Sequence, residues 1–165
     1  MAKDWSKFTK RVNIKASVEE IIAAWTTQTG LERWFLRKAE FTDLNNERRD
    51  PNSRIEKGDL YRWLWHGWGD ETVQFGTIVQ MNAKDPLEFT FGKAGIVKVL
   101  VKKEKEEIIV ELVQEGIPTD EDSKINYHVG CSTGWTFYLA NLKSVLEGGL
   151  DLRNKNTGLK DMVNS

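Results

Sequence analysis

Apolar and polar residues alternate in five consecutive segments of the chain, and this two-residue period is typical of strands with one buried face. The segments are residues 60–66, 74–82, 87–91, 96–102 and 107–114. Short polar connections separate them, including a turn expected over 84–86, so neighbouring strands should run antiparallel. Two further short strands are predicted at 12–15 and 38–42.

A helical spacing of apolar residues occurs at both ends of the chain. Ser17 and Glu20 form a capping-box pattern, which predicts a helix directly after it, and a second short helix is expected over 31–35. Near the C-terminus, apolar residues recur at intervals of four, three and four: Trp135, Leu139, Leu142 and Leu146. Gly148 and Gly149 are a strong helix stop, so a long helix should end just before them.

These elements predict an α+β fold, in which a curved antiparallel sheet of about six strands grips a long C-terminal helix. One face of the sheet would be apolar, and the last helix is the only long amphipathic element left to cover it. At 165 residues the chain is expected to be a single domain over 1–165, with 150–165 as a polar C-terminal tail. The long polar loop over 44–58 is either functional or a variable surface excursion.

The strand over 60–66 has two different faces. Tyr61, Trp63 and Trp65 point one way, whereas Arg62 and His66 point the other way and prefer water. We therefore expect the three aromatic side chains to face the last helix. By the same alternation, Phe89 and Phe91 also face inwards.

The first half of the last helix consists of small residues, Gly130-Cys131-Ser132-Thr133-Gly134. Large rings opposite small residues allow two interpretations. One is complementary packing without a void, and the other is a cavity lined by rings and a few polar tips. Trp and Tyr each carry a polar group that needs a partner, which favours the cavity, but both interpretations stay open.

Residues with catalytic potential are few. His66 is expected to be an exposed turn residue, and His128 lies three residues before Cys131, so a thiol–imidazole pair is conceivable. No third group that would orient such a pair is identifiable, and a buried structural Cys is commoner. The acidic run over 120–122 lacks the glycine and terminal Glu of a calcium loop. We predict no catalytic residue, no metal ligand and no cofactor.

Composition narrows the class of protein further. With 24 basic and 25 acidic residues, the net charge of −1 argues against nucleic-acid binding. The only cysteine cannot form an internal disulfide, and neither a signal peptide nor an apolar run long enough for membrane insertion is found, which favours the cytoplasm. Seven Trp residues are many for one small domain.

Three groups of motifs resemble one known family. Residues 14–25 are similar to its opening strand and helix. Residues 57–63, 76–79 and 85–91 resemble its glycine-led strand, its G-x-V strand and a shortened form of its D-P-x-x-L-x-F-T-W strand. Gly134-Trp135 followed by Leu139, Leu142 and Lys143 is similar to its closing-helix motif. The chain thus resembles the START-like (SRPBCC) helix-grip superfamily, in the branch of homologues of the activator of the ninety-kilodalton heat-shock protein's ATPase.

The resemblance implies a sheet gripping a helix, often with a cavity between them, and members that bind apolar ligands or other proteins. It carries over no catalytic residue. The predicted function is non-catalytic binding of a small apolar or aromatic, lipid-like ligand. The predicted ligand contacts are Tyr61, Trp63, Trp65, Phe89, Phe91, Trp34 and Trp135. The alternative is a co-chaperone-like protein-interaction module, and a cavity enzyme ranks third; the oligomeric state stays open.

Overall fold

The computed structural model describes residues 2–82 and 87–165, and the turn expected over 84–86 lies outside this range. The elements in chain order are β1 (Lys7–Asn13), α1 (Val18–Thr26), α2 (Gln28–Trp34), β2 (Lys38–Thr42), β3 (Leu60–Leu64), β4 (Val73–Gln80), β5 (Leu87–Thr90), the 3₁₀ turn η1 (Gly92–Ala94), β6 (Ile96–Glu104), β7 (Glu107–Glu115), α3 (Glu121–Ser123), the π-helical segment η2 (Lys124–Val129) and α4 (Gly130–Leu146).

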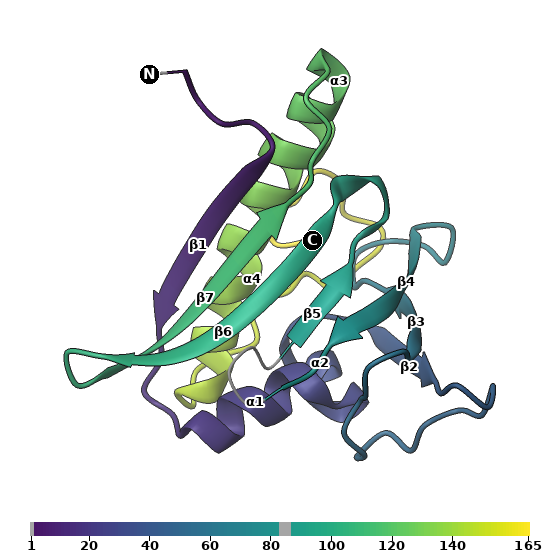
Figure 1. Cartoon of the computed structure of the whole chain (residues 1–165), viewed down its shortest axis with the longest axis vertical. Helices are drawn as coiled ribbons and strands as arrows, with labels where there is room; N and C mark the ends of the chain where they lie inside the picture. Colours follow the sequence, from purple (N-terminus) through teal and green to yellow (C-terminus); the bar gives the residue numbers. More distant parts are fainter. Residues whose placement is uncertain (1, 83–86) are drawn as a thin grey trace.

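The strands form one antiparallel sheet in the order β1-β7-β6-β5-β4-β3-β2. Figure 1 shows the sheet curving around α4, with α1 and α2 below one end of it. The predicted α+β helix-grip architecture is confirmed, with seven strands instead of about six. Because β1 pairs with β7, the first and last strands of the chain are neighbours, and β1 forms one edge of the open sheet while β2 forms the other.

The prediction of the first strand is wrong in its position. The strand begins at Lys7, and seven of its residues pair with β7. Phe8 and Val12 are half-buried against the core, but Lys10 stands between them on the same face and interrupts the apolar alternation. Backbone hydrogen bonds with β7 hold this edge strand whether or not each inward side chain is apolar.

Both predicted helix signals are present as hydrogen bonds. In the capping box, the Glu20 amide donates to Ser17 Oγ at 3.1 Å, and the Ser17 amide donates to Glu20 Oε2 at 2.9 Å. After α4, Gly148 adopts a φ of +82°, and the Gly149 amide donates to the Ser144 carbonyl at 2.7 Å. This arrangement is a Schellman motif, which requires the left-handed conformation that glycine adopts freely.

The last helix begins earlier than its apolar spacing indicates. Asp120 caps α3 by accepting the Ser123 amide at 3.0 Å, so the acidic run over 120–122 starts a helix. The chain then winds through η2, where the Gly130 amide donates to the Ile125 carbonyl, before it enters α4. The π-helical winding thus lies where the small-residue half of the helix begins.

The loop over 44–58 is fastened to the body of the protein. Ile55 is 2% exposed and belongs to the core. The Arg49 guanidinium donates to both carboxylate oxygens of Asp59, which is fully buried, and the Glu56 amide donates to the same carboxylate at 2.9 Å. A charge-assisted bidentate pair therefore fixes the base of this loop.

The tail after α4 is also docked. Arg153 is 8% exposed, and its guanidinium donates to the carbonyls of Glu32, Arg33 and Leu36 at 3.0 Å each. These carbonyls lie at the end of α2 and just beyond it, where they lack intrahelical partners, so Arg153 acts as a C-terminal cap supplied from another part of the chain. Within the described residues, no helix has the length and apolar character needed to cross a membrane.

Candidate functional site

The seven aromatic side chains predicted as ligand contacts divide into two groups. Four of them form a solid cluster in the core, each at most 2% exposed: Trp34, Tyr61, Trp63 and Phe89. Tyr61 stacks on Trp63 with ring centroids 3.9 Å apart, and Phe89 meets Trp63 edge-on at 5.0 Å. The Tyr61 hydroxyl donates to the Thr90 carbonyl at 2.5 Å. In this half of the grip, rings fill the space between the sheet and the helices.

The other three predicted residues line a hollow beside α4 that is largely open to solvent, and we call this hollow the chamber. Its volume is about 210 Å³. It is lined by Trp65, Phe91 and Trp135 together with Phe35, Asn126, Gly130, Cys131, Gly134 and Tyr138. The two open interpretations therefore apply to different halves of the same interface. The role of all seven predicted residues as ligand contacts stays a prediction.

The chamber exists because the helix presents glycine to the aromatic walls. A Cβ atom at Gly134 would have no heavy atom within 4 Å, and one at Gly130 would meet only the Ile125 carbonyl oxygen at 3.6 Å. Any larger residue at these two positions would place its side chain in or near the hollow. The run of small residues was the sequence signal for this space.

The wall formed by Trp135 is positioned by a buried amide that the sequence reasoning did not single out. The Trp135 indole N–H donates to Gln114 Oε1 at 2.9 Å, and Gln114 Nε2 donates to the Ala94 carbonyl at 2.9 Å. Gln114 is fully buried on β7. A signal did exist, since position 114 continues the inward series of Ile108, Val110 and Leu112, where a polar residue needs a partner.

A surface groove of about 480 Å³ adjoins the chamber. It is lined by Gln74, Phe91, Gly92, Lys93, Ala94, Tyr127 and Cys131. Phe91 and Cys131 line both spaces, so the chamber and the groove are neighbours separated by these two side chains. A molecule held in the chamber can therefore extend into the groove.

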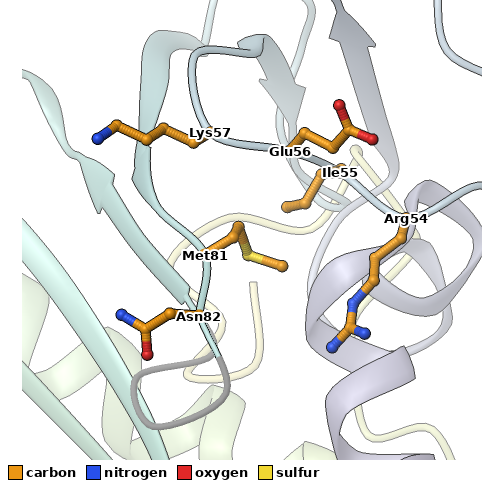
Figure 2. Close-up of a pocket in the computed structure, with 6 residues that line it drawn as sticks. All are labelled: Arg54, Ile55, Glu56, Lys57, Met81 and Asn82. Carbon is orange, nitrogen blue, oxygen red and sulfur yellow. The ribbon is translucent and has the colours of Figure 1, made fainter.

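A further hollow of about 390 Å³ lies on another side of the molecule, between the loop before β3 and the end of β4. Figure 2 shows Ile55 and Met81 pointing towards each other, whereas the charged ends of Glu56 and Lys57 point away from them. Its lining ends at Asn82, next to the undescribed residues. Since its polar groups do not converge, we place no site there.

The conceivable thiol–imidazole pair does not form. His128 Nδ1 lies 2.9 Å from the Trp5 carbonyl oxygen, and the ring packs edge-on against Trp5 and Phe8. The Cys131 thiol is instead hydrogen-bonded to the Gln114 side chain. Burial raises the pKa of this thiol, which favours its unreactive protonated form. Among residues 2–82 and 87–165, no group of three or more His, Cys, Asp or Glu is placed to hold a metal ion.

His66 does not have the exposed position expected of it, because it is half-buried beside the docked tail. Burial, together with the positive charges of Arg153 and Lys155, lowers its pKa to about 4. At the chamber wall, burial raises the pKa of Tyr138 to about 12. Both side chains are therefore uncharged at neutral pH, and the chamber has no charged lining residue within the described chain.

Comparisons with known proteins give one family and several solved structures. The model of the family described as "Activator of Hsp90 ATPase homolog 1-like protein" matches residues 15–147. Protein SSP2350 from Staphylococcus saprophyticus is 15% identical with a TM-score of 0.67, covering 90% of this chain and 96% of its own. The Aha1 dimer from Colwellia psychrerythraea is 17% identical with a TM-score of 0.64, covering 87% and 97%.

CalU16 from Micromonospora echinospora is 19% identical with a TM-score of 0.59, covering 87% of this chain and 76% of its own. At these identities the likeness concerns the fold alone. No curated protein sequence matches the chain.

Proposed function

The chain belongs to the family of Activator of Hsp90 ATPase homolog 1-like proteins, and from this premise we propose that it binds a small apolar or aromatic, lipid-like ligand in the chamber without changing it chemically. This membership confirms the resemblance expected from the sequence motifs. The family and its fold support a module that binds a ligand or a partner protein. The observation that favours a ligand is the chamber itself, in which two helix glycines face aromatic walls.

The chemistry of the lining supports an apolar ligand. Five of the nine lining residues are aromatic, and the backbone of Gly130 and Gly134 allows close approach from the helix side. The chamber alone, at about 210 Å³, is smaller than the ~300 Å³ at the low end of ligand pockets. The ligand would therefore occupy the chamber with its apolar body and extend into the adjoining groove.

The arrangement favours binding over catalysis. The thiol of Cys131 has a raised pKa and an amide partner, and His128 is bonded to a backbone carbonyl. Among the described lining residues, no acid and base face each other across the chamber. A substrate held there would meet rings and amide groups.

The test is a fluorescence titration with N-phenyl-1-naphthylamine, a neutral aromatic probe that brightens in apolar surroundings. We expect the wild-type protein to bind it and Gly134→Leu to bind it at least tenfold more weakly, because the new side chain occupies the chamber. Ala140→Leu, on an exposed part of the same helix, is the matched control and should bind normally. Failure of the wild type to bind, or equal binding by Gly134→Leu, would overturn the proposal.

A second candidate function is the co-chaperone-like partner-binding module. Besides the family's description, it is favoured by Trp68, Leu159 and Met162, which are 40–49% exposed around a hollow of about 240 Å³. Exposed apolar groups of this kind mark partner surfaces. It predicts that the protein raises the ATPase rate of purified Hsp90 and that Met162→Lys weakens this effect. An unchanged rate with the protein in excess would exclude it.

A further inference from the structure

We propose that the ligand is an amphipathic acid, whose anionic group is bound where the groove meets the chamber, by Lys93, Tyr127 and Asn126. This inference rests on the proposed function, because it assigns the polar end of a ligand whose apolar body lies in the chamber. It names a chemical class, namely a flat apolar molecule carrying a carboxylate, sulfonate or similar group.

The three polar side chains come from two elements that border the chamber and the adjoining groove. Lys93 lies in η1, two residues after the shared wall residue Phe91. Asn126 and Tyr127 are consecutive residues of η2, and Asn126 lines the chamber while Tyr127 lines the groove. The π-helical winding lies at this junction, and such segments are frequent at functional sites.

These side chains lack partners within the described part of the chain, since none of them takes part in a hydrogen bond or an ion pair there. The neighbouring polar groups are different: the Gln74 amide donates to the Phe75 carbonyl at 2.7 Å, and Gln114 is bonded on both sides. The junction therefore holds an ammonium, an amide and a phenol whose donors are all free for a ligand.

The charge of the junction favours an anion. Lys93 is the only charged residue among the described residues that line the chamber and the groove. No carboxylate lines either space within the described residues, so a cationic ligand would find no counter-charge. An anion, in contrast, would receive a charge-assisted hydrogen bond from Lys93 and neutral ones from Tyr127 and Asn126.

The apolar chamber and the donor group together define the shape of the ligand. The rings of Phe91 and Trp135 lie 6.0 Å apart at 44°, so the wall is built of aromatic faces and edges. A flat body against these rings would direct a substituent past Cys131 towards the groove. An apolar chain without a polar end would leave the donors solvated and would gain nothing from them.

The test compares two probes with the same aromatic body. 1-Anilinonaphthalene-8-sulfonate carries a sulfonate that N-phenyl-1-naphthylamine lacks, and Gly134→Leu measures any binding outside the chamber. We expect Lys93→Gln to weaken sulfonate binding about fivefold, as for one partly exposed ion pair, and to leave the neutral probe unchanged. Tyr127→Phe should weaken the sulfonate selectively as well. Lys57→Gln, at the separate hollow, is the matched lysine control.

The outcomes separate the two proposals. If the neutral probe binds in the chamber but Lys93→Gln leaves sulfonate affinity unchanged, or weakens both probes equally, the anionic assignment is overturned and the chamber function stands. If neither probe binds the wild type, the proposed function fails and this inference fails with it. The selective loss should also disappear in high salt, because screening removes the contribution of Lys93.

Discussion

Gly134 is the residue on which the chamber depends, and it also costs stability. A glycine in a helix interior is about 1 kcal/mol less favourable than alanine. Since a Cβ at Gly134 would meet no atom within 4 Å, we expect Gly134→Ala to raise the free energy of unfolding by about 0.5–1 kcal/mol. Urea unfolding measures this change. Gly148→Ala is the contrasting control: its φ of +82° is strained for alanine, so it should destabilise the protein.

His66 gives a pH prediction at the residue scale. Burial and the nearby charges of Arg153, Lys155 and Arg37 lower its pKa to about 4, and the weaker opposing influence of Asp151 does not reverse the shift. An unfolded histidine has a pKa of about 6.5. Between these values the unfolded chain binds the extra proton, so this contribution to stability is complete above pH 6.5 and is lost as the pH falls towards 4.

The measurement is urea unfolding at pH 7.5 and pH 5.0 for the wild type and His66→Gln. Because His66 is half-buried and screened by solvent, we expect the wild type to lose about 1 kcal/mol more than the variant over this interval. Equal losses for both proteins would show that His66 is not held neutral. An NMR titration of the ring would then give its actual pKa.

At the residue scale, the sequence predicted best those features whose physical cause lies within a single element. Alternation along one strand placed Tyr61 and Trp63 inside, where the structure buries them. Whether a ring fills space or lines it depends on which residue lies opposite, and strand periodicity holds no such information. Tyr138 became a wall residue through contacts with other elements, which no pattern around it indicates. The inward position of Gln114 on β7 did call for a partner, but only the fold shows that this partner is the wall residue Trp135.

At the scale of elements, the docked tail yields the clearest prediction. Arg153→Met should lower the free energy of unfolding by about 3 kcal/mol, because three carbonyls near the end of α2 and the Asp151 carboxylate lose a buried charged donor. The residues after α4 should become cleavable by protease in the folded protein. Lys155→Met is the control, since its one ion pair is exposed and should contribute little.

The sequence could predict those elements whose ends are fixed by hydrogen bonds between residues close together in the chain. The capping box at Ser17 and the glycine stop at Gly148 act through hydrogen bonds within a few residues, so their patterns are legible in the chain. The order of the central strands followed from short connections. The anchoring of the loop over 44–58 through Arg49, and of the tail through Arg153, depends on partners that only folding brings near.

For the whole molecule, the two halves of the grip differ in how their space is filled. The cluster around Trp63 fills one half with rings and supplies packing that any ligand would disturb. The other half keeps a hollow, because glycine stands on the helix where a side chain would otherwise complete the core.

This division predicts that a filled chamber and a bound ligand are alternatives. N-phenyl-1-naphthylamine at about 100 times its Kd should stabilise the wild type by ~2.7 kcal/mol and raise its melting temperature by about 5–11 °C. Gly134→Leu should show no such rise, since the side chain already occupies the site, whereas Ala140→Leu should respond like the wild type. Calorimetry measures this shift in melting temperature, and so does differential scanning fluorimetry read at a wavelength where the probe does not emit. A rise of equal size in Gly134→Leu would place the probe outside the chamber, and the ligand site would have to be sought on another face.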